Sequence, residues 1–224
     1  MGIQERRERE REQTRTKIMN AARELFAREG YDTVSMRRIA QAIEYSPTAI
    51  YVHFKDKEDL FRELCREDFG KLAEVFAKLS KVQDPVERVI QIGHVYIRFA
   101  LEYPNHYRLM FMTAHQYPPD EPLPAHKGDP DQDAYAFLKL AVQQAIEQGR
   151  FRPELKDAEL LTQIFWATAH GIASLQIVKG KDLWVDWSPV EKRAGVGLDA
   201  IVRGLLADPD QLPLPHPKRK AGGK

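Results

Sequence analysis

Polar and apolar positions in residues 33–57 follow the pattern of two short helices joined by a turn. Over residues 36–43, apolar side chains recur at the spacing that gives an α-helix one buried face. Ser35 precedes this segment as a candidate N-cap. After a turn, Ser46 and Pro47 suit the cap and the first residue of a second helix. The pattern predicts a helix–turn–helix.

The second of these helices is short and directs polar and aromatic groups outward. Ile50 and Phe54 fall on its inner side, whereas Thr48, Tyr51 and His53 fall on its outer side. So short a helix gains little stability from its own hydrogen bonds and needs support from neighbouring helices. Insertion into a DNA major groove is the use that fits such a supported, outward-facing helix.

The same helical periodicity continues through most of the chain. No alternating strand pattern and no internal repeat competes with it, so the fold class expected is all-α. Helices are predicted over residues 14–29, 57–80, 85–103, 104–116, 131–148, 157–178 and 189–207. Residues 117–130 are rich in proline and acid, and they are predicted to form a loop.

The predicted elements divide the chain into four parts. They are a charged N-terminal arm (1–13), a three-helix DNA-binding domain (14–60), a larger helical ligand-binding and dimerisation domain (61–207) and a disordered tail (208–224). The arm alternates arginine and glutamate, which fits either a solvated extension of the first helix or a disordered arm. Its arginines could touch phosphates or a minor groove.

Composition narrows the class of protein. Lys and Arg number 34 against 33 Asp and Glu, giving a net charge of +1, so any nucleic-acid surface must be local. The single cysteine, Cys65, cannot form an internal disulfide, which favours a reducing cytoplasmic setting. No apolar stretch approaches the ~20 residues of a membrane span, and the charged N-terminus is unlike an export signal.

Ten residues in and around the helix–turn–helix are candidates for DNA contact. Hydroxyls and cations near helix starts suit phosphates, while small or ring-bearing groups suit base edges. The candidates are Ser35, Arg37, Ser46, Pro47, Thr48, Ala49, Tyr51, His53, Lys55 and Lys57. Alternatives remain for single members: Tyr51 could pack within the domain, His53 could cap a helix, and the lysines could be plain surface residues.

Central helices of the second domain carry apolar and amphipathic groups that could line a pocket for an aromatic or lipophilic molecule. These are Tyr96, Phe99, Tyr107, Met110, Phe111, Trp166 and His170, and ordinary core packing is the alternative for each. The histidines show no metal-site spacing, so no metal is expected. No glycine-rich phosphate loop or nucleophile elbow is present, so neither a cofactor nor an enzyme is expected.

Residues 17–64 resemble the TetR family of bacterial transcriptional regulators. The Tyr-x-His-Phe-Lys-x-Lys run at residues 51–57, placed directly after a helix–turn–helix, is the most specific part of the likeness. The carrying residues are Ile18, Ala21, Ala22, Leu25, Phe26, Gly30, Thr33, Ser35, Ile39, Ala40, Ser46, Ile50, Tyr51, His53, Phe54, Lys55, Lys57, Leu60 and Phe61. The family often has glycine in the turn where this chain has Glu44, so Glu44 is expected to need a left-handed backbone or an altered turn.

The C-terminal part resembles one subgroup of TetR-family ligand-binding domains, through residues 103–111 and a Trp-x-x-x-His-Gly helix at residues 166–171. The resemblance implies a homodimer in which a small-molecule effector controls binding to a palindromic double-stranded operator, with repression as the family-level expectation. Helices 157–178 and 189–207 are the best candidates for the dimer contact. A small-molecule sensor or interaction protein without sequence-specific DNA binding is the alternative.

Overall fold

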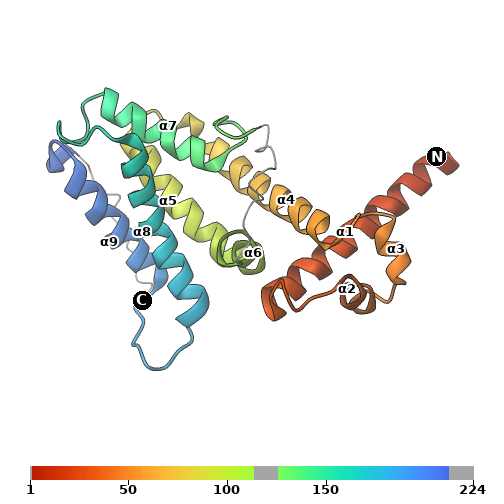
Figure 1. The fold of residues 1–224 in the computed structure, drawn as a ribbon. Coiled ribbons are helices and arrows are strands. Elements are labelled where there is room, and N and C mark those ends of the chain that lie inside the picture. The colour runs from red at the N-terminus through yellow and green to blue at the C-terminus, as the bar shows by residue number, and fades with distance from the viewer. Residues whose placement is uncertain (1, 114–125, 212–224) are drawn as a thin grey trace, which may run out of the picture. The chain divides into compact units, whose positions relative to one another are not determined.

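The computed structural model describes residues 2–113 and 126–211 of the 224-residue chain (Figure 1). Contacts divide the chain into two compact units, which we call unit 1 (residues 1–72 with 102–125) and unit 2 (residues 73–101 with 126–224). The predicted domains are parts of the chain expected to fold independently. Division by contacts does not test independent folding, so the predicted domain boundaries stay a prediction. Most of the expected loop and tail lies outside the described residues.

Unit 1 contains α1 (Ile3–Glu29), α2 (Met36–Ala42), α3 (Pro47–Tyr51), the first part of α4 (Lys57–Ala77) and α6 (Pro104–Met112). Local chemistry fixes most of its helix ends. Gly30 ends α1 with a φ of 87°, a backbone conformation that favours glycine, and its N–H donates to the Phe26 carbonyl. Ser35 and Ser46 cap α2 and α3 through their hydroxyls, as the sequence predicts.

The core of unit 1 is formed by apolar side chains from all of its helices. It comprises Ile18, Met19, Ala22, Leu25, Phe26, Val34, Met36, Ile39, Ala40, Ile50, Phe54, Leu60, Phe61, Leu64 and Leu109. Leu109 is the member supplied by α6, which is distant in sequence from the others. Burial of this set holds the short α2 and α3 in place.

Unit 2 contains α5 (Pro85–Glu102), α7 (Ala134–Glu147), α8 (Ala158–Lys179) and α9 (Val190–Leu205), with a 3₁₀ turn after α4 at Lys78–Lys81. Helix α8 packs against both α7 and α9 (Figure 1). Gly93 of α5 allows close packing on α9, because a Cβ there would lie 2.8 Å from a methyl of Leu198.

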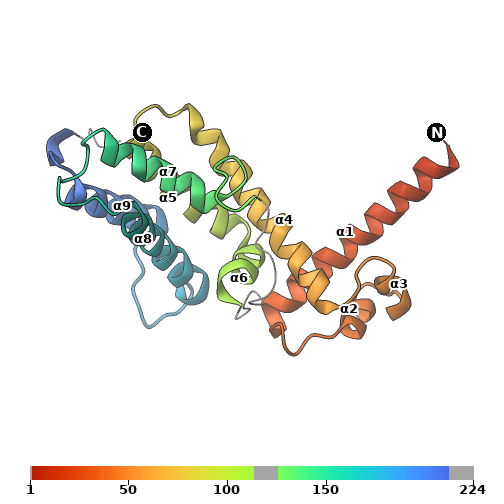
Figure 2. The same cartoon turned by 45° about the horizontal axis from the view of Figure 1, so that its top comes forward.

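The all-α prediction is confirmed. Within the described residues the only extended pairing is a single bridge between Phe151 and Leu206. Most observed helix ends lie within a few residues of the predicted ones, and α1 is the main difference. It begins at Ile3 as one continuous helix (Figure 2), which is the helical alternative left open for the charged arm.

Candidate nucleic-acid interface

The turn between α2 and α3 depends on one residue in the left-handed region. Glu44 has a φ of 60°, and the following N–H, that of Tyr45, donates to the Ala40 carbonyl at 3.0 Å. A side chain in this region costs about 1–2 kcal/mol relative to ordinary helical backbone. Of the two alternatives expected for a non-glycine residue at position 44, a left-handed backbone or an altered turn, the structure has the left-handed backbone.

Helix α3 separates buried from exposed groups as its pattern indicates. Ile50 is fully buried and Phe54, just after the helix, is 1% exposed, whereas Tyr51 is 54% exposed. Thr48 is exposed on the same short helix. Val52, which the sequence pattern does not single out, is 64% exposed beside Tyr51 and adds apolar surface.

The remaining DNA candidates divide into exposed and half-buried groups. Ser35, Arg37, Ser46, Pro47 and Lys55 are exposed, while Ala49, His53 and Lys57 are half-buried. The Ser35 and Ser46 hydroxyls already accept helix N–H groups, which leaves their hydroxyl protons for another acceptor.

Two of the basic candidates differ in availability. The Lys57 ammonium donates to the Tyr31 carbonyl at 3.0 Å and lies 4.2 Å from the centre of the Tyr31 ring. The Lys55 side chain makes no hydrogen bond or ion pair with residues 2–113 or 126–211. Lys55 is therefore the better placed of the two to meet a phosphate.

His53 lies in a positive local field. Burial lowers the pKa of its imidazole, and the positive charges of Arg11 and Arg15 lower it further, against a smaller opposing effect of Glu12. Its ring is consequently neutral at pH 7, and it presents one donor and one acceptor nitrogen.

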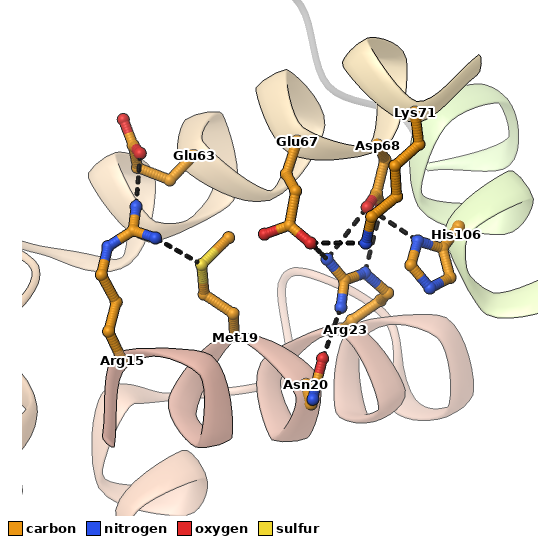
Figure 3. Close-up of polar contacts among 9 residues, drawn as sticks. All are labelled: Arg15, Met19, Asn20, Arg23, Glu63, Glu67, Asp68, Lys71 and His106. Atoms are coloured by element: carbon orange, nitrogen blue, oxygen red, sulfur yellow. Dashed lines mark hydrogen bonds and ion pairs between the residues drawn. The ribbon is translucent and has the colours of Figure 1, made fainter. Parts of the chain in front are cut away.

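A buried ion-pair cluster ties α4 to α1 and α6 (Figure 3). Arg23 of α1 makes two hydrogen bonds to Asp68 of α4, Nε to Oδ2 at 3.1 Å and Nη2 to Oδ1 at 2.9 Å. A third hydrogen bond joins Nδ1 of His106, on α6, to Oδ1 of Asp68 at 2.7 Å. Arg15 and Glu63 add a further α1–α4 ion pair at 2.6 Å. The first part of α4, which begins with the DNA candidate Lys57, is thereby fixed to α1 and α6.

The seven ligand candidates are distributed over both units. Tyr96, Phe99, Trp166 and His170 belong to unit 2, and Tyr107, Met110 and Phe111 belong to unit 1. In unit 1, the Phe111 ring centre lies 5.3 Å from that of Tyr107 and 5.5 Å from that of Phe69. The structure therefore does not gather all seven within one unit.

Within unit 2, three candidates form a connected group. The Tyr96 hydroxyl lies 3.0 Å from Nδ1 of His170, and the Trp166 indole N–H donates to the same hydroxyl at 3.2 Å. Tyr96 is 4% exposed, whereas Trp166 is 37% exposed, so the group extends from the core to the surface. Burial lowers the pKa of His170, so its imidazole is neutral at pH 7.

A hollow of about 270 Å³ lies in unit 1, between α1 and the start of α6. Its lining is mostly polar and includes none of the predicted ligand residues: Asn20, Arg23, Glu24, Glu102, Tyr103, Pro104, Asn105 and His106. The described residues contain no cluster of three or more potential metal-ligating side chains. No described helix combines the length and the apolar character needed to cross a membrane.

Comparisons with known proteins agree with this geometry. Residues 18–64 match the family described as "Bacterial regulatory proteins, tetR family", and residues 89–191 match "Tetracyclin repressor-like, C-terminal domain". The HTH-type transcriptional repressor AcnR of Corynebacterium diphtheriae is 42% identical over 69 residues, which are 31% of this chain and 36% of that protein. The HTH-type transcriptional repressor Rv1474c of Mycobacterium tuberculosis is 45% identical over 64 residues, 29% of this chain and 34% of that protein.

The matched stretches thus span about a third of the length of these curated relatives. The likeness to solved structures extends further along the chain. The fatty acid degradation regulator FadR from Bacillus halodurans superposes with a TM-score of 0.67 at 17% identity, covering 85% of this chain and 95% of that one. At this identity the likeness concerns the fold alone. Because separate N-terminal and C-terminal matches coincide with the helix–turn–helix and the helices that follow it, the chain belongs to the TetR family of bacterial regulatory proteins.

Proposed function

We propose that this protein is a cytoplasmic, ligand-responsive transcriptional regulator that binds a palindromic DNA operator as a homodimer. A small molecule bound by the C-terminal helices releases the operator, so the protein acts as a repressor. Family membership and relatives that are themselves HTH-type transcriptional repressors support this proposal.

The observation that carries the proposal is the surface of α3. Ile50 and Phe54 anchor it in the core of unit 1, while Thr48 and Tyr51 point away from that core. A threonine methyl or hydroxyl and a tyrosine ring can each contact base edges or phosphates in a major groove. The ammonium of Lys55, which no described residue pairs, supplies a cation beside them.

A two-fold dimer would place two copies of α3 in successive major grooves, about 34–36 Å apart. Exposed apolar residues on α8 and α9 support a dimer contact there: Leu175, Val178 and Val196 are 48%, 54% and 64% exposed. We expect Ile201→Glu on α9 to give a monomer by light scattering. An unchanged molar mass would contradict this choice of surface.

For the effector, we propose the group of Tyr96, Trp166 and His170 as the polar recognition point. Two aromatic faces and a neutral imidazole suit an aromatic or lipophilic molecule that carries one polar atom. Helix α4 runs from unit 1 into unit 2 and is one covalent route by which effector binding would reach the DNA-binding helices. A coupling free energy of about 1–3 kcal/mol would be typical.

Operator binding tests the proposal directly. Fluorescence anisotropy at matched salt should show tighter binding to a palindrome from the DNA flanking the coding region than to a scrambled duplex. Tyr51→Ala should lower operator affinity at least tenfold, since removal of a base or phosphate contact costs roughly 1–3 kcal/mol in each half-site. Tyr103→Ala is the matched control, because this tyrosine is similarly exposed (45%) but lies at the start of α6.

Equal affinity for palindromic and scrambled DNA would refute sequence-specific regulation and favour the alternative of a sensor without DNA recognition. Equal losses in Tyr51→Ala and Tyr103→Ala would show that the α3 surface has no special role.

A further inference from the structure

The charged segment at the start of the chain is a continuous part of α1. The helix runs without interruption from Ile3 to Glu29, and the Gly2 N–H is capped by the Glu5 carboxylate at 2.9 Å. A continuous helix fixes the direction of every side chain along it, at about 100° per residue. The arginines of this segment therefore have definite positions relative to the helix–turn–helix.

Two of these arginines lie on the same face of α1 as its buried residue Ile18. At 100° per residue, Arg7 and Arg11 fall within about 20° of the direction of Ile18. Ile18 is fully buried in the core that also holds Ile50 of α3. Arg7 and Arg11 lie beyond the end of this core and are exposed. They therefore project on the side of α1 where α3 lies.

The environment of His53 supports this placement independently. Of the charged groups that act on His53, just after α3, Arg11 has the strongest effect and Arg15 the next. Glu12 opposes them but ranks last, so the arginines dominate the local field. The arginine-bearing end of this helical face thus adjoins the surface of α3 that is proposed to contact bases.

Arg7 and Arg11 also differ from their neighbours in pairing. Arg6 is paired with Glu10 at 2.9 Å, and Arg15 is paired with Glu63. Neither Arg7 nor Arg11 forms an ion pair or hydrogen bond with any residue in 2–113 or 126–211. Their guanidinium groups are therefore available to an external anion.

We propose that Arg7 and Arg11 bind phosphates of the DNA backbone beside the bases contacted by α3, so that α1 acts as a rigid clamp. This inference rests on the proposed function. A helix with side chains is about 10–12 Å across and the minor groove only about 6 Å wide, so a helical arm lies over the backbone rather than inside that groove. Guanidinium groups bind phosphate oxygens through paired, charge-assisted hydrogen bonds.

The test compares two double variants with the same change in net charge. Arg7→Gln with Arg11→Gln alters the proposed face, and Arg6→Gln with Arg9→Gln alters other faces of the same helix. Glutamine is nearly as good a helix former as arginine, so the helix should persist. Dissociation constants for the operator and a scrambled duplex are measured between 50 and 200 mM salt.

The Arg7/Arg11 variant should bind both duplexes at least tenfold more weakly at 50 mM salt, by the same factor. Its slope of log affinity against log salt should fall by about 3.6, at about 0.9 for each of the four arginine–phosphate pairs that the dimer can no longer form. In the Arg6/Arg9 variant, the slope of log affinity against log salt should fall by less than half as much. Arg7→Lys with Arg11→Lys should restore most of the binding, which separates removal of charge from misfolding.

Equal slopes in the two glutamine variants would overturn the clamp, because a general charge effect would then explain the weaker binding. A change confined to the operator would also overturn it, since phosphate contacts do not discriminate sequence. Failure of the unaltered protein to prefer its operator would refute the proposed function instead. These results are distinguishable in one set of titrations.

Discussion

Replacement of Asp68 by asparagine should destabilise the protein strongly. Asp68 is 0% exposed and Arg23 is 3% exposed, so neither charge has much access to water. Asparagine keeps the size of the side chain but removes the negative charge that faces the Arg23 guanidinium. Breaking a buried ion pair from one side costs about 3–5 kcal/mol, because the remaining charge stays buried without compensation.

The hydrogen bonds of the cluster place the destabilisation within that range. Two hydrogen bonds from Arg23 to Asp68 become weaker, and each charge-assisted bond contributes roughly 1.5–3 kcal/mol. Glu67 lies 3.5 Å from Arg23 and is 39% exposed, so it compensates in part. We therefore expect the free energy of unfolding to fall by about 3 kcal/mol, near the lower end of the range for a broken buried ion pair.

Urea unfolding followed by far-UV circular dichroism measures this difference. Protein concentration must be held constant, since the proposed dimerisation would contribute to apparent stability. Glu24→Gln is the control, because it breaks only the exposed pair with Arg28 and should cost less than about 1 kcal/mol. The reasoning would be refuted if Asp68→Asn lowered the free energy of unfolding by no more than Glu24→Gln does. Replacing Arg23 and Asp68 together by Met and Leu should cost less than Asp68→Asn alone.

Three further predictions concern Glu44, Cys65 and a set of three histidines. Glu44→Gly should raise the free energy of unfolding by about 0.5–1 kcal/mol, because glycine adopts a φ of 60° without strain, and a decrease of stability in urea would contradict this. Burial raises the pKa of Cys65 to about 12, so its thiol in the folded protein should react with Ellman's reagent on the order of 1,000-fold more slowly than in urea, and equal rates would disprove its protection. Burial lowers the pKa of His53, His94 and His170 below 6.5, so the unfolded chain binds more protons and stability should be lost as pH falls below about 6.5. The urea midpoint should be lower at pH 5.5 than at pH 7.5, with a smaller decrease in His94→Asn/His170→Asn, and a midpoint that rises on acidification would exclude this linkage.

Features set by neighbouring residues were predictable from the sequence. The caps at Ser35 and Ser46 and the end of α1 at Gly30 each depend on a few consecutive residues. The inward direction of Ile50 and Phe54 follows from helical period alone. The course of α1 through residues 3–13 was not predictable, because alternating opposite charges suit either a solvated helix or a disordered arm.

Features set by distant residues could not be read from local patterns. His106 meets Asp68 across 38 positions of sequence, and Tyr96 meets His170 across 74. Periodicity shows which face of a helix is apolar but does not name the partner of a polar side chain. The contact of Lys57 with Tyr31 is of the same kind, since the two residues lie 26 positions apart in the sequence.

Helix α6 has a practical consequence for engineering chimeric regulators. Unit 1 is discontinuous, and α6 supplies Leu109 to its apolar core and His106 to its ion-pair cluster. A graft that joins residues 1–72 to a foreign sensor would leave a cavity in place of Leu109 and take a partner from Asp68. A working hybrid must therefore transplant residues 102–113 together with the N-terminal segment, or redesign the recipient helix to fill the same space.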